Sequence, residues 1–312
     1  MTADRFLRAL PKIQLHCHLE GTLRASSFLD LAQRRGVALT YRPEGDESHD
    51  AGELYRFADF SEFLLAFAAV SRSLAEPADY GRLAREYIED ACAQNVVYAE
   101  LFISPSVWQF FHPAIDVRAA VREMRGAFEA AKPAIDVHLI VDLTRNFGAQ
   151  GAMRTARLAC DLRDLGVIGI GLGGDEARFP AALFVEAFDF ARAHGLQCVA
   201  HAGEAAGAHS VLDAVELLGA QRIGHGIRAL EDGGVVELLK RRRIALECAP
   251  TSNVLTGAVP AGAEHPLVLL DELGVLVTID ADDPAMFRTS ITEELAIVQS
   301  MTSRSDVVRF VR

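Results

Sequence analysis

Short apolar runs alternate with amphipathic stretches along most of this chain of 312 residues. Between the apolar runs, hydrophobic residues recur every three or four positions, as in residues 81–95 and 117–131, and this spacing predicts helices. The runs themselves are rich in valine, isoleucine and leucine and have the length of buried strands. The eight predicted strands are residues 13–18, 96–103, 135–143, 167–172, 196–202, 222–226, 244–249 and 275–280.

Eight strands that alternate with helices predict a parallel sheet of the α/β class, and their number predicts closure into a (β/α)8 TIM barrel. An open doubly wound sheet is the alternative, and it is disfavoured because no G-x-G-x-x-G motif follows the first strand. We expect one domain over residues 1–312. Residues 26–80 are predicted as a helical insertion over the barrel mouth, because this segment is too short for a good core of its own.

Polar side chains collect where several of these strands end. In a barrel, the carboxyl ends of all strands open onto one face, so groups far apart in the sequence would converge there. His16 and His18 are two residues apart on one strand and therefore share a face, which allows them to bind one cation. Each group in isolation has an ordinary structural explanation, and it is their convergence that favours a site. The groups at these ends are His16, His18, His201, Glu204, His225, Asp282 and Asp283.

Three imidazoles and a carboxylate, from His16, His18, His201 and Asp282, suit one catalytic zinc ion with water as a further ligand. Water bound in this way loses a proton near neutral pH and becomes a nucleophile. Barrel hydrolases that hold two metals use a carboxylated lysine after strand four, and this chain has no lysine there. One zinc ion per chain is therefore expected, and a two-metal hydrolase is the less favoured alternative.

Three titratable groups remain for acid–base chemistry. A carboxyl group such as Glu204 in a dry pocket has a raised pKa and can donate a proton. His225 could hold or deprotonate the attacking water, and Asp283 could accept or relay a proton. His112, His138, His194, His209 and His265 are expected to be structural or exposed.

Two further features border the predicted pocket. The glycine run at Gly171, Gly173 and Gly174 could let backbone N–H groups approach a flat ligand closely. The apolar helix that carries Phe63 and Phe67 is either core or a hydrophobic wall over the pocket.

Composition narrows the class of partner. The formal net charge of −12 argues against a nucleic-acid backbone or an anionic membrane surface. Five scattered cysteines without a C-x-x-C pair argue against a disulfide framework and favour a reducing cytoplasm. No stretch approaches 18 uncharged apolar residues, and the first residues lack the apolar core of a signal peptide. We therefore expect a cytoplasmic protein with a small-molecule substrate, whose oligomeric state the sequence does not specify.

Six motifs in chain order carry a resemblance to a known family: PKIQLHCHLEG, GLGGDE, HAGE, RIGHG, CAPTSN and TIDADDPAMF. Together they resemble the adenosine deaminase family of the amidohydrolase barrels, over about residues 10–300. The resemblance implies the zinc ligands named above, Glu204 as the acid that protonates purine N1, and His225 as the group that orients hydroxide. It also implies that Asp283 contacts the attacking water or purine N7 and that the Gly174 N–H meets N3. The implied reaction is hydrolytic deamination of adenosine, or a closely related 6-aminopurine nucleoside, to inosine and ammonia.

The departures from the family pattern concern the substrate. Glu20 replaces the usual aspartate that meets the ribose 5′ hydroxyl, and its side chain is one methylene longer. Adenine deaminases resemble the chain in HLEGTL but typically have a DSSE-like stretch where Gly173–Glu176 stand. A further branch deaminates aminodeoxyfutalosine, whose carboxylate Arg145 could meet; capping or surface exposure is the alternative for this arginine. The expected substrate contacts are His18, Glu20, Phe63, Phe67, Gly174 and Asp283. A zinc-containing barrel that binds purine nucleosides without catalysis is a remote alternative.

Overall fold

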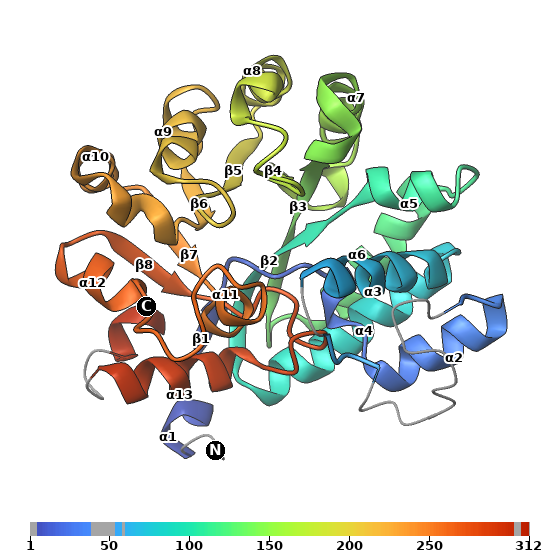
Figure 1. Ribbon diagram of the computed structural model, residues 1–312. Coiled ribbons are helices and arrows are strands. Elements are labelled where there is room, and N and C mark those ends of the chain that lie inside the picture. The colour runs from blue at the N-terminus through green and yellow to red at the C-terminus, as the bar shows by residue number, and fades with distance from the viewer. Residues whose placement is uncertain (1–4, 39–53, 58–59, 303–306, 312) are drawn as a thin grey trace.

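The sheet is a ring of eight parallel strands that follow one another in chain order (Figure 1). The computed structural model describes residues 5–38, 54–57, 60–302 and 307–311. The strands are β1 (Lys12–Gln14), β2 (Val96–Ile103), β3 (Asp136–Thr144), β4 (Val167–Gly173), β5 (Gln197–Ala202), β6 (Arg222–His225), β7 (Ala245–Cys248) and β8 (Leu276–Ile279). A bridge between Cys17 and Asp282 joins the last strand end to the first. The predicted (β/α)8 barrel is confirmed.

Helices surround the ring as an outer layer (Figure 1). Their apolar faces follow the helical period, as in α6, where the side chains of Val117, Val121, Met124 and Phe128 are buried. The helices are α1 (Arg5–Ala9), α2 (Ala25–Arg35), α3 (Phe60–Ser73), α4 (Pro77–Ala93), α5 (Pro105–Phe111), α6 (Val117–Ala131), α7 (Gly148–Asp161), α8 (Val185–Ala193), α9 (Ala208–Glu216), α10 (Gly233–Arg242), α11 (Pro250–Leu255), α12 (Leu267–Glu272) and α13 (Ile291–Met301).

The first strand is shorter than predicted. β1 ends at Gln14, so His16 and His18 lie beyond the regular strand. The backbone leaves the ladder there because the Asp280 carboxylate accepts hydrogen bonds from the N–H groups of Leu15 and His16. His18 then pairs with Phe102 in an isolated parallel bridge. The two histidines therefore lie beyond the regular strand, on a segment that still pairs with β2 on one side and with the end of β8 on the other.

The barrel interior combines a small apolar cluster with a charged network. Phe102, Ile140 and Val199 pack together as one buried cluster, separate from the main core. Deeper in the ring, Arg222 donates to the carboxylates of Glu100 and Glu247. Because the two carboxylates are buried, they depend on this guanidinium for charge compensation.

The predicted insertion contains α2 and α3, while its residues 39–53 and 58–59 lie outside the described part. Phe63 of α3 stacks on Phe287, with ring centroids 4.8 Å apart. Since Phe287 follows β8, this contact places α3 beside the carboxyl ends of the strands. That the segment covers the mouth, and that residues 1–312 form one domain, stay predictions.

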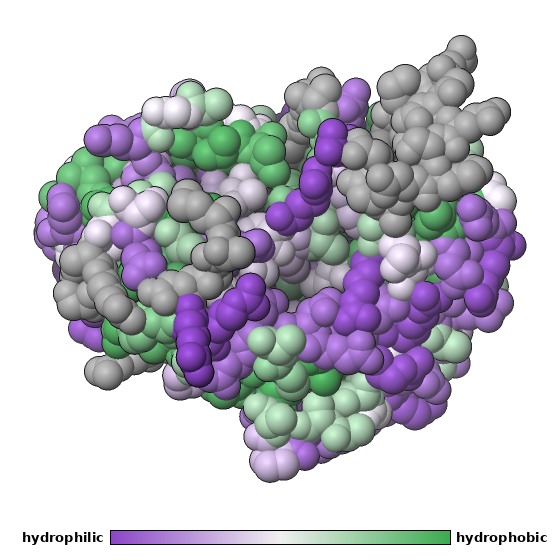
Figure 2. All heavy atoms as spheres, turned by 90° about the horizontal axis from the view of Figure 1, so that it is seen from below, coloured by the Kyte–Doolittle hydropathy of each residue, from purple (hydrophilic) through white to green (hydrophobic). Residues whose placement is uncertain are grey.

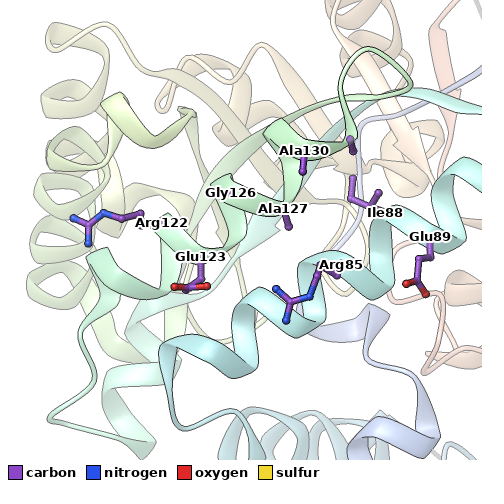
Figure 3. Close-up of a pocket in the computed structure, with 9 residues that line it drawn as sticks. Arg85, Ile88, Glu89, Arg122, Glu123, Gly126, Ala127 and Ala130 are labelled. Atoms are coloured by element: carbon purple, nitrogen blue, oxygen red, sulfur yellow. The ribbon is translucent and has the colours of Figure 1, made fainter.

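The outer surface offers a groove between α4 and α6 (Figure 3). Its lining combines the charged side chains of α4 and α6 with the small residues Gly126, Ala127, Ala130 and Ala131. None of the lining residues is a histidine or a cysteine. On the face shown in Figure 2, hydrophilic side chains separate the apolar patches from one another. Among the described residues, no helix is both long enough and apolar enough to cross a membrane.

We expect that Arg222→Met lowers the free energy of unfolding by about 3 kcal/mol, because the carboxylates of Glu100 and Glu247 lose their shared cation. Urea unfolding of the two proteins measures the difference. The matched control is Arg242→Met, which breaks a pair with Glu216 in which both side chains are more than two-fifths exposed; it should leave the unfolding midpoint unchanged. Equal effects of the two substitutions would contradict this account of the interior.

Candidate metal centre and active site

Four predicted ligand residues meet at the carboxyl end of the barrel. One ligand atom from each of His16, His18, His201 and Asp282 lies within 4.8 Å of the others, and all four residues are buried. The Nε2 atoms of His18 and His201 are 3.2 Å apart. The Oδ1 atom of Asp282 lies 3.5 Å from His16 Nε2 and 3.4 Å from His18 Nε2. The chain therefore aims three imidazole nitrogens and one carboxylate oxygen at a common point.

The chemistry of these donors fits a divalent metal ion. Burial lowers the pKa of His18 to about 4, and burial together with the neighbouring histidines lowers the pKa of His201 well below its usual value. Both imidazoles are therefore neutral at pH 7 and present lone pairs. The Nε2 atom of His16 is buried and has no hydrogen-bond partner among the protein atoms. A mixed nitrogen and oxygen set of this size is typical of zinc and related ions.

The backbone around the centre is held in uncommon conformations. Asp282 and His225 have φ values of +59° and +61°, which residues with side chains rarely adopt. Two glycines give the side chains room. A Cβ atom at Gly21 would lie 1.8 Å from Asp283 Oδ1, and one at Gly224 would lie 2.6 Å from His16 Cε1. The motifs HLEG and RIGHG therefore need glycine because no larger residue leaves space for these site groups.

A second layer of residues orients the ligands. The Nδ1 atom of His16 lies 2.9 Å from the Glu247 carboxylate, and the Ser252 hydroxyl donates to Asp282 Oδ2 at 2.6 Å. Such outer partners fix the ring orientation of metal-binding histidines. The sequence analysis assigned no role to Glu247 or Ser252. Glu247 is a lone glutamate in a short apolar strand, and Ser252 lies in the quoted motif CAPTSN without any local sign of its partner.

Glu204 and His225 lie beside the ligand cluster. The Oε2 atom of Glu204 is 3.5 Å from His225 Nε2, which in turn is 4.0 Å from Asp282 Oδ2. Burial raises the pKa of Glu204, with the charge of Asp282 acting in the same direction, so a protonated carboxyl is favoured relative to a free glutamate. One fifth of its side chain is exposed, so a ligand can reach it.

The loop that carries Glu204 is anchored by one carboxylate. Glu176, at the end of the motif GLGGDE, accepts hydrogen bonds from four successive backbone N–H groups of this loop, those of Gly203, Glu204, Ala205 and Ala206. Its side chain is therefore fully engaged in holding the loop. Glu176 thus holds the backbone of Glu204 in place, and its carboxylate has no oxygen left for a ligand.

Five described carboxyl groups have a buried oxygen without a hydrogen-bond partner, and three of them interact electrostatically with the site or with one another: Glu20 Oε2, Asp142 Oδ1 and Asp283 Oδ1. Burial raises the pKa of all three, and the pKa of Asp142 rises to about 7. The other oxygen of Glu20 accepts from Trp108 Nε1 at 2.6 Å and from the Ser104 N–H. Each free oxygen can accept a hydrogen bond when ionised or donate one when protonated.

Asp142 was missed by the sequence analysis, although an aspartate inside the apolar run of strand three was a visible signal. A Cβ atom at Gly173 would lie 2.5 Å from Asp142 Oδ2. One at Gly171 would lie 2.5 Å from the Phe102 ring and 3.0 Å from Asp142 Oδ1. The glycine run therefore makes room for this buried acid and for Phe102. The sequence also predicted that a backbone N–H group of this run approaches a flat ligand. Gly174 is the residue of the run for which this stays a prediction; it has a φ of +97° and lies beside Asn146.

The remaining predicted positions are placed as follows. Phe63 is buried and Phe67 packs beside it, with ring centroids 6.2 Å apart. Arg145 is fully buried and donates to the backbone carbonyls of Phe179 and His201. Of the two roles considered for Arg145, the structure favours the capping one, because both terminal nitrogens already have partners.

Comparison with known proteins places the chain in one family. The family model described as adenosine deaminase matches residues 11–306. An adenine deaminase of Rhizobium leguminosarum bv. trifolii is 35% identical over 299 residues, covering 95% of this chain and 90% of that protein. An adenine deaminase of Streptomyces coelicolor is 37% identical over 284 residues, covering 90% and 81%.

Solved structures agree with this assignment. The crystal structure of adenine deaminase from Arthrobacter aurescens has a TM-score of 0.88 at 28% identity, covering 97% of this chain and 92% of its own. An amidohydrolase from Burkholderia ambifaria with bound zinc has a TM-score of 0.86 at 28% identity, covering 98% and 85%. The N6-methyl-AMP deaminase of Arabidopsis thaliana has a TM-score of 0.84 at 25% identity, covering 98% and 91%. The resemblance inferred from the six motifs is confirmed.

We expect the purified protein to contain about one equivalent of a divalent metal ion and to lose its activity when the ion is chelated. Asp282→Asn should weaken metal binding by more than the roughly 10–100-fold that removal of an outer-layer partner costs, because the anionic ligand is lost. Metal analysis after equilibrium dialysis measures this. Asp189→Asn on the surface of α8 is the control, and a metal content near two equivalents would instead support a two-metal site.

Proposed function

The chain belongs to the adenosine deaminase family, and we propose that it removes the 6-amino group of a purine nucleoside such as adenosine, with one zinc ion per chain. Family membership makes it a hydrolytic deaminase that acts on C–N bonds of purines. One observation carries the proposal: three histidines and an aspartate from distant strands converge on one point, with Glu204 and His225 directly beside it. His16, His18, His201 and Asp282 would hold the ion.

The bound ion would act as a Lewis acid and would make a nucleophile from water at neutral pH. The proton transfers and the orientation of the water would be carried out by side chains of the protein. In the proposed reaction, Glu204 gives a proton to purine N1, which breaks the aromaticity of the ring and makes C6 electrophilic. The water oxygen bonds to C6 and gives up its two protons: one passes through Asp283 to the amino group, and the other returns to the Glu204 carboxylate. The C6–N6 bond then breaks, and ammonia leaves. The raised pKa of Glu204 supports its role as the proton donor at N1.

His225 and Asp283 border the attacked carbon in this proposal. His225 Nε2 lies between the carboxylates of Glu204 and Asp282 and is placed to hold the attacking oxygen. The unpartnered Oδ1 of Asp283 is available to the purine or to the water, because no protein donor occupies it. Burial and the charge of Asp282 raise the pKa of Asp283, which favours an acid that exchanges a proton during the cycle.

The substituent at purine N9 is the open part of the proposal. The relatives named above are adenine deaminases, and one structural neighbour is an N6-methyl-AMP deaminase, so the family barrel serves both a base and a nucleotide. We favour a nucleoside for two reasons. The segment Gly173–Glu176 lacks the serines typical of adenine deaminases, and Glu20 keeps a free oxygen for a hydroxyl donor.

Free adenine is the second candidate, and the names of the relatives favour it. Glu20 also supports it in part, because one of its oxygens is already held by Trp108 and Ser104 and the side chain cannot extend freely. We do not extend the proposal to a carboxylate-bearing nucleoside such as aminodeoxyfutalosine, because the guanidinium of Arg145 is buried on backbone carbonyls.

Glu204→Gln should retain the metal and lose kcat by on the order of 10²–10⁴, because an amide cannot transfer a proton to N1. Ammonia release with adenosine and with adenine measures activity, and metal analysis of the same sample measures the site. Glu237→Gln, on the exposed side of α10, is the matched control and should behave as the parent protein. Near-normal turnover by Glu204→Gln would remove the proposed acid from the mechanism.

The choice between the two substrates is tested by the ultraviolet change that accompanies purine deamination. We expect kcat/KM for adenosine and deoxyadenosine to exceed that for adenine by on the order of 10² or more, because a buried acceptor that pairs with a sugar hydroxyl is left unpaired by the free base. The opposite order would assign the chain to the adenine deaminases and leave the roles of Glu204 and His225 intact.

A further inference from the structure

A chain of hydrogen bonds leads from a backbone amide to His225. The Leu267 N–H, at the start of α12, donates to Nδ1 of His265 at 3.1 Å. The Nε2 atom of His265 lies 3.1 Å from Oδ1 of Asn253, and Nδ2 of Asn253 lies 2.9 Å from Nδ1 of His225. All three side chains are buried, so no bulk water competes for these bonds.

The direction of every bond in this chain follows from its first donor. A backbone N–H can only donate, so Nδ1 of His265 must accept and carries no proton. Burial lowers the pKa of His265 to about 4, so the ring is neutral at pH 7 and its single proton is on Nε2. That proton is donated to Asn253, whose side-chain oxygen therefore faces His265 and whose NH2 group faces His225.

The same rule applies to the last hydrogen bond of this series, the one between Asn253 and His225. Because the Asn253 NH2 group donates to Nδ1 of His225, this nitrogen must accept and has no proton. The proton of a neutral His225 is then on Nε2, the atom that lies 3.5 Å from Glu204 Oε2 and 4.0 Å from Asp282 Oδ2. The other tautomer would place two N–H groups of Asn253 and His225 against each other in a buried site.

We infer that Asn253 and His265 are positioning residues that fix His225 as the Nε2–H tautomer, so that it enters the reaction as a hydrogen-bond donor. This rests on the proposed function only in placing His225 at the attacked carbon. It also decides between the two roles considered for His225 from the sequence. The ring holds the attacking oxygen through Nε2–H, and it does not take up the proton of the water at that nitrogen.

The arrangement suits a site in which the attacking oxygen carries negative charge. A donor aimed at that oxygen stabilises the charge that develops as the bond to C6 forms. An imidazole with an unprotonated Nε2 would place a lone pair against the same oxygen and repel it. The tautomer therefore affects the rate of the chemical step, while substrate binding stays unchanged because Asn253 and His265 lie behind the ring.

The test combines three variants with the metal-loaded enzyme. Asn253→Asp keeps the shape but replaces the donor to His225 by an acceptor, which stabilises a proton on Nδ1. His265→Asn and His265→Gln form a matched pair, because the asparagine oxygen replaces Nδ1 and keeps only the bond from Leu267, whereas the glutamine amide replaces Nε2 and keeps the donor to Asn253. Ring nitrogen spectra of ¹⁵N-histidine-labelled protein locate the proton on His225, with the signal assigned by its loss in His225→Gln.

We expect the parent enzyme and His265→Gln to show the His225 proton on Nε2, and Asn253→Asp to show one on Nδ1. In serine proteases, an orienting residue whose replacement gives the wrong histidine tautomer costs about 10⁴ in kcat. We expect a kcat loss of on the order of 10³–10⁴ for Asn253→Asp and about 10–100-fold for His265→Asn, with KM and metal content unchanged. His265→Gln should keep kcat near that of the parent.

A parent spectrum with the His225 proton on Nδ1 would overturn the inference, whatever the variants do. It would also be overturned if Asn253→Asp left tautomer and kcat unchanged, or if both His265 variants lost kcat equally. Failure of the proposed function is a separate outcome. In that case the parent enzyme deaminates no purine, while its spectrum still reports the tautomer of His225.

Discussion

The barrel closes through the residues that carry the proposed metal ligands. The His18 N–H donates to the Asp282 carbonyl, and the Asp282 N–H donates to the His16 carbonyl, which joins the segments after β1 and β8. The same two segments aim His16, His18 and Asp282 at one point. Closure and site geometry are therefore one constraint. A change that opens the ring at this seam also separates the ligands, and a bound cation that draws the ligands together also strengthens the seam.

Several energetically unfavourable features surround the point at which His16, His18, His201 and Asp282 converge. Asp282 and His225 keep positive φ values, and neutral imidazole nitrogens face one another at 3.2 Å. Glu247 sits buried between His16 and Arg222, so the charge of the interior network reaches the metal centre through one carboxylate. Such features destabilise a folded chain unless surrounding structure and a bound ligand offset them. Their concentration at one end of the barrel marks that end as the functional one.

The features that could be predicted from the sequence are those with a regular spacing of apolar residues or a short motif. Short apolar runs and the helical spacing between them predicted eight strands and the ring, and the strand ends predicted the four residues that converge. The extent of the first strand was wrong, because Asp280, more than 260 residues away, diverts its backbone. Glu176, Glu247 and Asn253 received no role from the sequence, although Glu176 and Asn253 lie in the quoted motifs GLGGDE and CAPTSN. Each acts through a hydrogen bond to a residue at least 27 positions away, and such a bond leaves no spacing to read.

In the proposed site, selection among purines would depend on groups that the fold leaves without hydrogen-bond partners. Glu20, Asp142 and Asp283 each keep a buried oxygen without a partner, and a buried polar atom left unpaired costs about 1–3 kcal/mol. A ligand that pairs with such an oxygen recovers this free energy, whereas one that fills the space with an apolar group does not. Because these acids are distinct from the four proposed metal ligands, a change of substrate preference at these positions would leave the proposed ligand set in place.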